Sequence, residues 1–327
     1  MKQRWNFSAC FSGICLIFLI LDSSLVLQGA QAGLDLCLKT VIPSLFPFIV
    51  ITSMLTNSVT LGSGYLGYAA GWLGIPDAAS SVVIPAFLGG YPVGAKCVHD
   101  LYRNGNLEKK QAERLLAFCS NAGPSFLFGM VAGLFPEAYM VWILWIIHIA
   151  SALMTAAVFS TERETSNSTS RQLSAVVVTD VLPSSMKAMG LICCWVILFR
   201  IMVTFLEHWC LWLLPQWLQV LITGLLELTN GFCELASIER IETRFVLSSC
   251  MLAFGGVCVL MQTRSVTGEL SLKFYIMGKL IQTGFSLLLS GVVLLESGWV
   301  FAAVIPVILF LFRKIQKSCG NPDAVPV

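Results

Sequence analysis

The sequence predicts an all-α, polytopic membrane protein, and composition is the first observation behind that prediction. Hydrophobic residues make up 57% of the 327 residues and charged residues only 12%, whereas about a quarter of a typical soluble domain is charged. The mean hydropathy is +0.82. A net charge of +2 spread over the chain offers no basic face for nucleic acid. We therefore expect a lipid bilayer around the protein and no nucleic acid as a partner.

The second observation is a series of long uncharged runs. Every backbone N–H and C=O group in a bilayer must be paired, and runs rich in Leu, Ile and Phe achieve that as helices rather than as barrel strands. Because about 20 apolar residues make one span, we expect about eight transmembrane helices, with a range of about six to ten. Gly and Pro should break several of them or make them re-entrant. The runs are residues 5–21, 40–76, 78–95, 115–136, 138–161, 208–226, 245–263, 280–295 and 297–312.

The amino-terminal run allows two interpretations. Lys2 and Arg4, an apolar stretch and then Ala30-Gln31-Ala32 match a cleavable secretory signal. The alternative, which we favour because further runs follow at once, is a first membrane helix with its amino end in the cytoplasm. Basic side chains also follow the last run within residues 313–317. Since basic residues favour the cytoplasmic side, both termini are expected to face the cytoplasm.

The polar residues form no recognisable catalytic or metal-binding motif. Most of the 12 cysteines lie in or beside the apolar runs, no CxxC pair occurs, and the three histidines lack partners at ligand spacing. The cysteines are expected to act as small hydrophobic residues. The sequence also lacks the GxSxG, HExxH and P-loop patterns. We expect no metal, no cofactor, and neither enzymatic nor ATP-driven activity.

An internal repeat is the most informative pattern in the chain. Val41-Ile42-Pro43-Ser44 recurs as Val181-Leu182-Pro183-Ser184, each time ahead of a long apolar stretch. A chance match is the alternative, because Gly and Pro are common in membrane helices. However, further pairs of matching segments occur in the same order and at similar spacing, which indicates a duplication. These looser pairs are residues 84–94 with 222–232, and residues 121–124 with 253–256.

The duplication divides the chain into two halves and predicts a polar linker that contains the stretch TSNSTS. Residues 96–114 carry more Lys and Arg than the corresponding residues 234–244, where glutamates are interspersed. This charge difference predicts that the halves are inverted in the membrane. The parts are an amino-terminal helix and its connection (1–34), a first repeat (35–160), the linker (161–175), a second repeat (176–312) and a cytoplasmic tail (313–327).

Interrupted apolar segments at matching positions of two halves are typical of secondary transporters, in which the interruptions form the binding site. In the first half, Gly89 and Gly90 free the backbone, and Pro92 suits the first turn of a new helix. The positive end of that helix would lie beside Tyr91 and favour an anionic group. A packing kink between two close helices is the alternative.

A second break is predicted at the segment SNAGP. Ser120 and Asn121 supply polar side chains there, while Gly123 and the proline that follows interrupt the helix. Freed carbonyl groups at such a break would hold a cation or a hydrogen-bond donor of a ligand. Here too a packing kink is the alternative.

The second half contributes Glu227, Thr229 and Asn230. A carboxylate at the end of an uncharged run costs about 2.5 to 3.5 kcal/mol at the centre of a bilayer, so Glu227 is expected to face a cavity or a partner. We predict that it binds the coupling ion or proton. The alternative is a residue at headgroup level that marks the end of a span.

These segments resemble the YlbJ family of sporulation integral membrane proteins, which carry the nucleoside-recognition, or Gate, domain. The resemblance spans residues 30–290, and the combination of GYPVGAK with SNAGP is its most specific part. This chain has Gly89-Gly90 where family members usually have Ser-Gly, and Cys119-Ser120-Asn121 where they have Thr-Asn or Asn-Asn. The resembling stretches are DLCLKTVIPSLFPFIV from Asp35, GGYPVGAK from Gly89, LLAFCSNAGPSF from Leu115, LLELTNG from Leu225 and FGGVCVLMQ from Phe254.

The resemblance implies a bacterial permease, in the cell membrane or in a membrane around the forespore, that moves dipicolinic acid, a small dianionic aromatic. Concentrative nucleoside transporters, the ferrous-iron permease and spore maturation membrane proteins share the Gate domain, so a gating role is also implied. We expect a permease or channel-like transporter for a small anionic solute. Two alternatives stay open: a non-transporting scaffold or gate subunit, acting with sporulation partners or as a homo-oligomer, and a nucleoside transporter.

Overall fold

The computed structural model describes residues 13, 16–58, 75–159 and 177–295, and this part of the chain is helical and contains no strand. Within it, five helices are long and apolar enough to cross a membrane, and two shorter apolar helices accompany them. The predicted all-α, polytopic class is confirmed. Most of run 5–21, all of run 297–312, the linker and the tail lie outside the described residues.

Most of the described chain is α-helical, with short 3₁₀ or π turns between some of the elements. One π-helical turn, Cys37–Val41, joins the first two helices into one long element. The α-helices are α2 (Ser23–Leu36), α3 (Ile42–Ser58), α5 (Val83–Leu88), α6 (Val93–Arg103), α7 (Lys109–Leu115), α8 (Pro124–Gly129), α9 (Ala138–Phe159), α10 (Val178–Trp209), α11 (Gln216–Leu226), α12 (Leu228–Leu235), α13 (Ile241–Phe254), α14 (Gly256–Thr267) and α15 (Lys273–Leu295).

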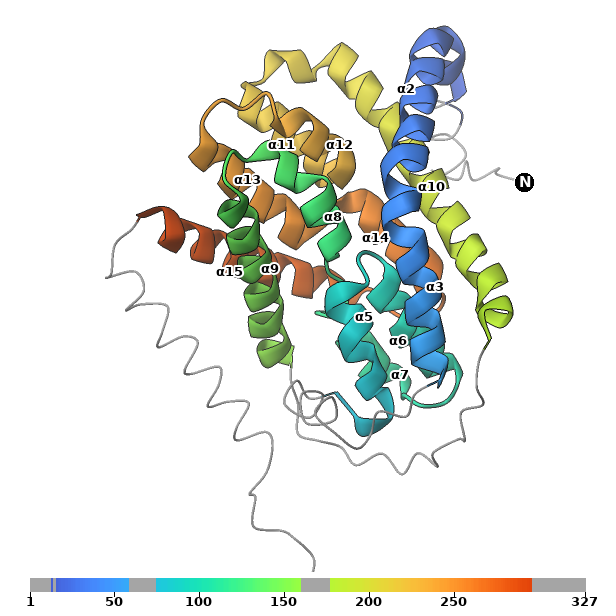
Figure 1. Ribbon diagram of the computed structural model, residues 1–327. Helices are drawn as coiled ribbons and strands as arrows, with labels where there is room; N and C mark the ends of the chain where they lie inside the picture. Colours follow the sequence, from blue (N-terminus) through green and yellow to red (C-terminus); the bar gives the residue numbers. More distant parts are fainter. Residues whose placement is uncertain (1–12, 14–15, 59–74, 160–176, 296–327) are drawn as a thin grey trace, which may run out of the picture.

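One flank of the molecule consists of α2 and α3 packed against α10 (Figure 1). Gly29 and Gly33 of α2 allow the approach, because a Cβ atom at either position would lie within 3.0 Å of the backbone of Ile201 or Ile197. Small residues four apart serve the same purpose in many membrane helix pairs. The Ala-Gln-Ala segment considered as a cleavage site lies between these two glycines, inside α2.

The opposite flank consists of α9, α13 and α15, which pack on one another (Figure 1). Serine side chains join two of them: the hydroxyls of Ser249 and Ser286 lie 2.7 Å apart, and Ser290 donates to Ser249 at 2.6 Å. The shorter helices lie between the flanks. For example, α8 contacts both α3 and α9, and α11 contacts both α10 and α13.

Two predicted runs do not form single spans. Run 208–226 divides because α10 ends at Trp209 and α11 begins only after Pro215. Run 115–136 divides at Gly123, where α8 begins. Conversely, α10 is a candidate span of 32 residues that a search for uncharged runs misses, because Lys187 and Arg200 lie within it.

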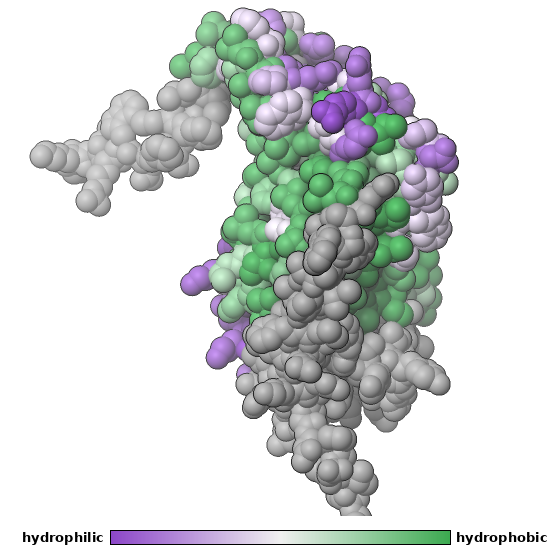
Figure 2. Space-filling model, turned by 90° about the vertical axis from the view of Figure 1, so that its left-hand side faces the viewer, coloured by the Kyte–Doolittle hydropathy of each residue, from purple (hydrophilic) through white to green (hydrophobic). Residues whose placement is uncertain are grey.

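The surface agrees with a membrane setting. Figure 2 shows hydrophobic residues over the middle of the visible face and hydrophilic residues gathered toward its ends. Large apolar side chains such as Ile146, Leu198 and Leu288 are each about half exposed or more, at 60%, 56% and 48%. Exposed apolar area on this scale is typical of contact with lipid or a protein partner.

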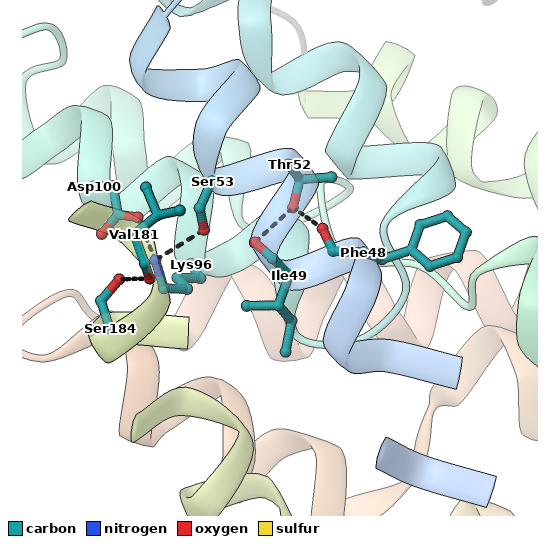
Figure 3. A network of polar contacts seen from close by, with 8 residues as sticks. All are labelled: Phe48, Ile49, Thr52, Ser53, Lys96, Asp100, Val181 and Ser184. Atoms are coloured by element: carbon teal, nitrogen blue, oxygen red, sulfur yellow. Dashed lines mark hydrogen bonds and ion pairs between the residues drawn. The ribbon is translucent and has the colours of Figure 1, made fainter. Parts of the chain in front are cut away.

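Each of the two Pro-Ser segments of the predicted repeat contains the same local hydrogen bond, from its serine to the carbonyl three residues earlier. Ser44 donates to the carbonyl of Val41 at 3.3 Å, and Ser184 donates to the carbonyl of Val181 at 2.9 Å. Figure 3 shows the second of these beside the point where Lys96 of α6 reaches α3. There Lys96 pairs with Asp100 at 2.7 Å and donates to Ser53 at 3.4 Å. The duplication itself stays a prediction.

Candidate functional site

The candidate site lies where broken helices begin. The chain turns after α5, and α6 then starts with Pro92 as its N-cap. Gly123 is the N-cap of α8, and Glu227 is the N-cap of α12. Tyr91, Gly123 and Glu227 line one cavity. The fold therefore brings together break residues from both predicted halves.

This inner cavity is small and mostly apolar. Its volume is about 50 Å³, and a buried water molecule needs about 10 to 15 Å³ on this measure, so it has room for a few waters. Polar side chains from four elements reach it: Thr40, Ser44, Thr229 and Gln262 line it beside Tyr91 and Glu227. The space is too small for an aromatic dianion in this conformation.

A wider pocket of about 450 Å³, here called the vestibule, adjoins the inner cavity. Thr40 lines both spaces, and Asn230 of the vestibule follows Thr229 of the inner cavity in the chain. Four charged vestibule residues form two ion pairs. Lys39 pairs with Asp35 at 2.9 Å, and Arg200 pairs with Glu207 at 2.9 Å. Glu234 is the other charged residue of the lining.

Glu227 is the buried carboxylate of the site, with a relative exposure of 2%. It accepts a hydrogen bond of 2.7 Å from the backbone N–H of Asn230 and so caps α12. Within the part of the chain that the structure describes, no Lys or Arg lies close enough to form an ion pair with it. The side-chain nitrogen of Asn230 is buried and lacks a hydrogen-bond partner among the described residues. An unpaired donor therefore lies at the boundary between the vestibule and the inner cavity.

The predicted site residues fall into two groups. Tyr91, Gly123, Glu227 and Thr229 line the inner cavity, and Asn230 lines the vestibule. The other five line neither space: Gly89, Gly90, Pro92, Ser120 and Asn121.

Asn121 instead fixes the break between α7 and α8. Its amide nitrogen donates to the carbonyls of Ala86 and Phe118 at 2.9 and 2.8 Å. Its amide oxygen accepts from Gln282 of α15 at 2.9 Å. Since all these partners belong to the protein, Asn121 acts in this structure as a connection between α5, the break and α15.

Lys279 and Gln282 were not predicted from the sequence. Lys279 of α15 is 2% exposed, and its ammonium contacts the Tyr91 hydroxyl, the Ser120 carbonyl and the Gln282 side chain. It precedes the uncharged run 280–295 by one residue, so a count of charges places it outside the span. The sequence does contain a signal for these residues, because polar side chains recur at helical spacing along one face of α15. They are Lys279, Gln282, Ser286 and Ser290.

Comparison with known proteins found one informative likeness. The chain is 28% identical over 120 residues to the sporulation integral membrane protein YlbJ of Bacillus subtilis (strain 168). The matched stretch covers 34% of this chain and 28% of YlbJ, less than a third of that relative's length. No family model and no solved structure matches. The chain is thus a multi-pass membrane protein with homology to a sporulation integral membrane protein, and the Gate domain stays a prediction.

Proposed function

We propose that the chain is a permease or channel-like secondary transporter for a small anionic solute in spore formation, with dipicolinate as the leading candidate. The observation that carries the proposal is the convergence of broken helices from both halves on one buried cavity, beside a wider charged vestibule. Broken helices surround the binding sites of many secondary transporters. The similarity to YlbJ supports the setting in sporulation. The proposal includes no enzymatic step and no cofactor.

Two features favour an anionic solute. Tyr91, which precedes the N-cap of helix α6, lines the inner cavity, so the partial positive charge at the first turn of this helix lies near the site. The amide nitrogen of Asn230, which has no hydrogen-bond partner in the described part of the chain, offers a donor. Glu227 would repel an anion when ionised, and we therefore propose that its carboxylate takes up a proton as the solute enters. Proton uptake of this kind would couple solute movement to a proton gradient.

The inner cavity corresponds in this proposal to a closed state. With room for only a few waters, it must widen before a solute passes from the vestibule. We propose that α6, α8 and α12 separate at their first turns, because these are the places where the backbone is already interrupted. Such movement around a fixed site is the usual form of alternating access.

Reconstitution into liposomes tests the function. Efflux of dipicolinate, a nucleoside and a divalent cation is compared for the full chain and for Gly90→Leu. Gly90 has a φ of 79°, and a Cβ there would lie 2.9 Å from Leu45, a residue of the inner cavity. A leucine should block the cavity. We therefore expect dipicolinate flux in the original chain and a flux lower by about tenfold or more in the variant. A tenfold loss corresponds to an increase of about 1.4 kcal/mol in the activation free energy.

Gly105→Leu is the matched control, because Gly105 also has a positive φ, 78°, but no described residue comes within 4 Å of its Cβ position. It should keep normal flux. If none of the three solutes crosses in the original chain, the transport proposal is wrong, and a scaffold or gate subunit becomes the better account. Competition by a nucleoside would instead favour a nucleoside carrier.

A further inference from the structure

A buried ammonium group, which has no carboxylate partner among the described residues, lies behind Tyr91. Lys279 is within α15, a candidate membrane span, and is 2% exposed. In the described part of the chain, no carboxylate oxygen lies within 4 Å of its Nζ atom. An isolated buried charge is costly unless hydrogen bonds satisfy it. The groups that surround Nζ therefore decide what this lysine does.

Three oxygen atoms surround the lysine nitrogen. They are the backbone carbonyl of Ser120, the side-chain oxygen of Gln282 at 2.9 Å and the hydroxyl of Tyr91 at 3.4 Å. The Nζ atom also lies over the face of the Tyr91 ring, 4.8 Å from the ring centroid. A cation is attracted to an aromatic ring at this distance. The three oxygens belong to three different segments of the fold.

The hydrogen-bond network shows that all three oxygens face Nζ as acceptors. The Ser120 carbonyl can only accept. Tyr91 donates its single proton to the carbonyl of Leu252 at 2.6 Å, so lone pairs of its oxygen remain for Lys279.

The orientation of Gln282 follows from its other partner. Asn121 must direct its amide nitrogen toward two backbone carbonyls, so its oxygen accepts from the Gln282 nitrogen. Gln282 therefore directs its own oxygen toward Lys279.

Three acceptors match the three N–H donors of an ammonium group. A neutral amine has two donors and one lone pair, and that lone pair would face an oxygen lone pair. We infer that Ser120, Gln282 and Tyr91 form a monovalent-cation site, which the chain fills with its own Lys279 ammonium. With the lysine side chain removed, the site would accept a primary alkylammonium ion. This inference goes beyond the proposed function and does not depend on it.

Packing of α15 holds the ammonium in this site. Gly278 lies directly against the carbonyl group of Ala117, where a Cβ atom would overlap it. The close approach brings the next residue, Lys279, to the break between α7 and α8. The tethered cation thus joins α15 to the Tyr91 turn and to the Ser120 break, and we expect this arrangement to need no dissolved sodium or potassium.

Chemical rescue of Lys279→Ala tests the inference. The full chain is purified in detergent, and thermal unfolding is followed with and without propylammonium, which replaces the atoms that the alanine lacks. Three unpaired acceptors should lower the Tm by about 5 °C or more. Propylammonium, present from solubilisation onward, should restore at least about half of that loss. Tetramethylammonium has the same charge but no N–H donor and should restore none.

Lys273→Ala is the matched control, since Lys273 is an exposed lysine of the same helix; its Tm should be unchanged with and without propylammonium. An unchanged Tm in Lys279→Ala, or equal effects of the two ammonium ions, would overturn the inference. If Lys279→Ala does not fold, ¹⁵N NMR of the unaltered, lysine-labelled chain decides. A solvent-protected nitrogen coupled to three protons supports the site, and one coupled to two protons contradicts it.

Discussion

Glu227 and Lys279 are two buried charged residues with the same exposure of 2%, yet their surroundings differ. Glu227 lines the inner cavity and accepts a local hydrogen bond from the first turn of α12. Lys279 lines neither the cavity nor the vestibule, and its partners include groups 159 and 188 residues away in the chain. Burial alone therefore does not identify a transport residue. A group that borders open space can exchange ligands or protons, whereas a fully enclosed group connects parts of the fold.

Tyr91 lies between these two environments. It lines the inner cavity on one side, while its hydroxyl contacts the Lys279 ammonium and the Leu252 carbonyl. The enclosed network therefore forms one wall of the cavity. A change on the Lys279 side should affect mainly stability, and a change on the Glu227 side should affect mainly flux.

Among three further variants, the largest loss of stability is expected for Gly278→Ala. A Cβ atom at Gly278 would overlap the backbone carbonyl of Ala117, so α15 must move away from the Lys279 site, at a cost of about 1 to 3 kcal/mol. Gly284→Ala is the control on the same helix, because no atom of the part of the chain that the structure describes lies within 4 Å of that Cβ position. Thermal unfolding in detergent measures both. Equal Tm values for the two variants would show that close packing of α15 is not what encloses Lys279.

A smaller loss is expected for Tyr91→Phe. The variant keeps the ring but leaves the Leu252 carbonyl without its donor and Lys279 without one of three acceptors, which should cost about 1 to 2 kcal/mol. Tyr139→Phe is a suitable control, since Tyr139 is 60% exposed. Chemical denaturation of both variants gives the comparison. A Tyr91→Phe protein as stable as the control would mean that the enclosed network does not support the cavity wall.

The smallest loss of stability, and the clearest change in flux, is expected for Glu227→Gln. Glutamine can still accept the Asn230 N–H bond, so the cost should stay below about 1 kcal/mol. The amide cannot take up a proton, so solute flux in liposomes should lose its response to an imposed proton gradient. Glu239→Gln, at an exposed position, should leave that response intact. A gradient response that survives in Glu227→Gln would remove the proposed coupling role.

Much of the fold follows from local properties of the sequence. The membrane class follows from the 12% charged fraction, and helix breaks were predicted at Pro92 and Gly123, where helices α6 and α8 begin. These features depend on backbone chemistry and on transfer free energies, which act over a few neighbouring residues. The span Val178–Trp209 is absent from the uncharged runs because Lys187 and Arg200 interrupt it, and the internal repeat alone indicates a long apolar stretch after Ser184. A helix flank can accommodate such side chains.

Only the tertiary structure decided which polar residues line the cavity and which connect parts of the fold. From the sequence, Asn121 and Glu227 were both expected to contact the ligand. In the structure, Asn121 forms hydrogen bonds to α5, to its own break and to Gln282, while Glu227 borders the cavity. A count of charges also placed Lys279 outside its span. Hydropathy is summed over neighbouring residues in the chain, so it can show that a polar group lies in an apolar segment and needs a hydrogen-bond partner. Which partner satisfies it depends on contacts across more than 150 residues, and packing alone brings those groups together.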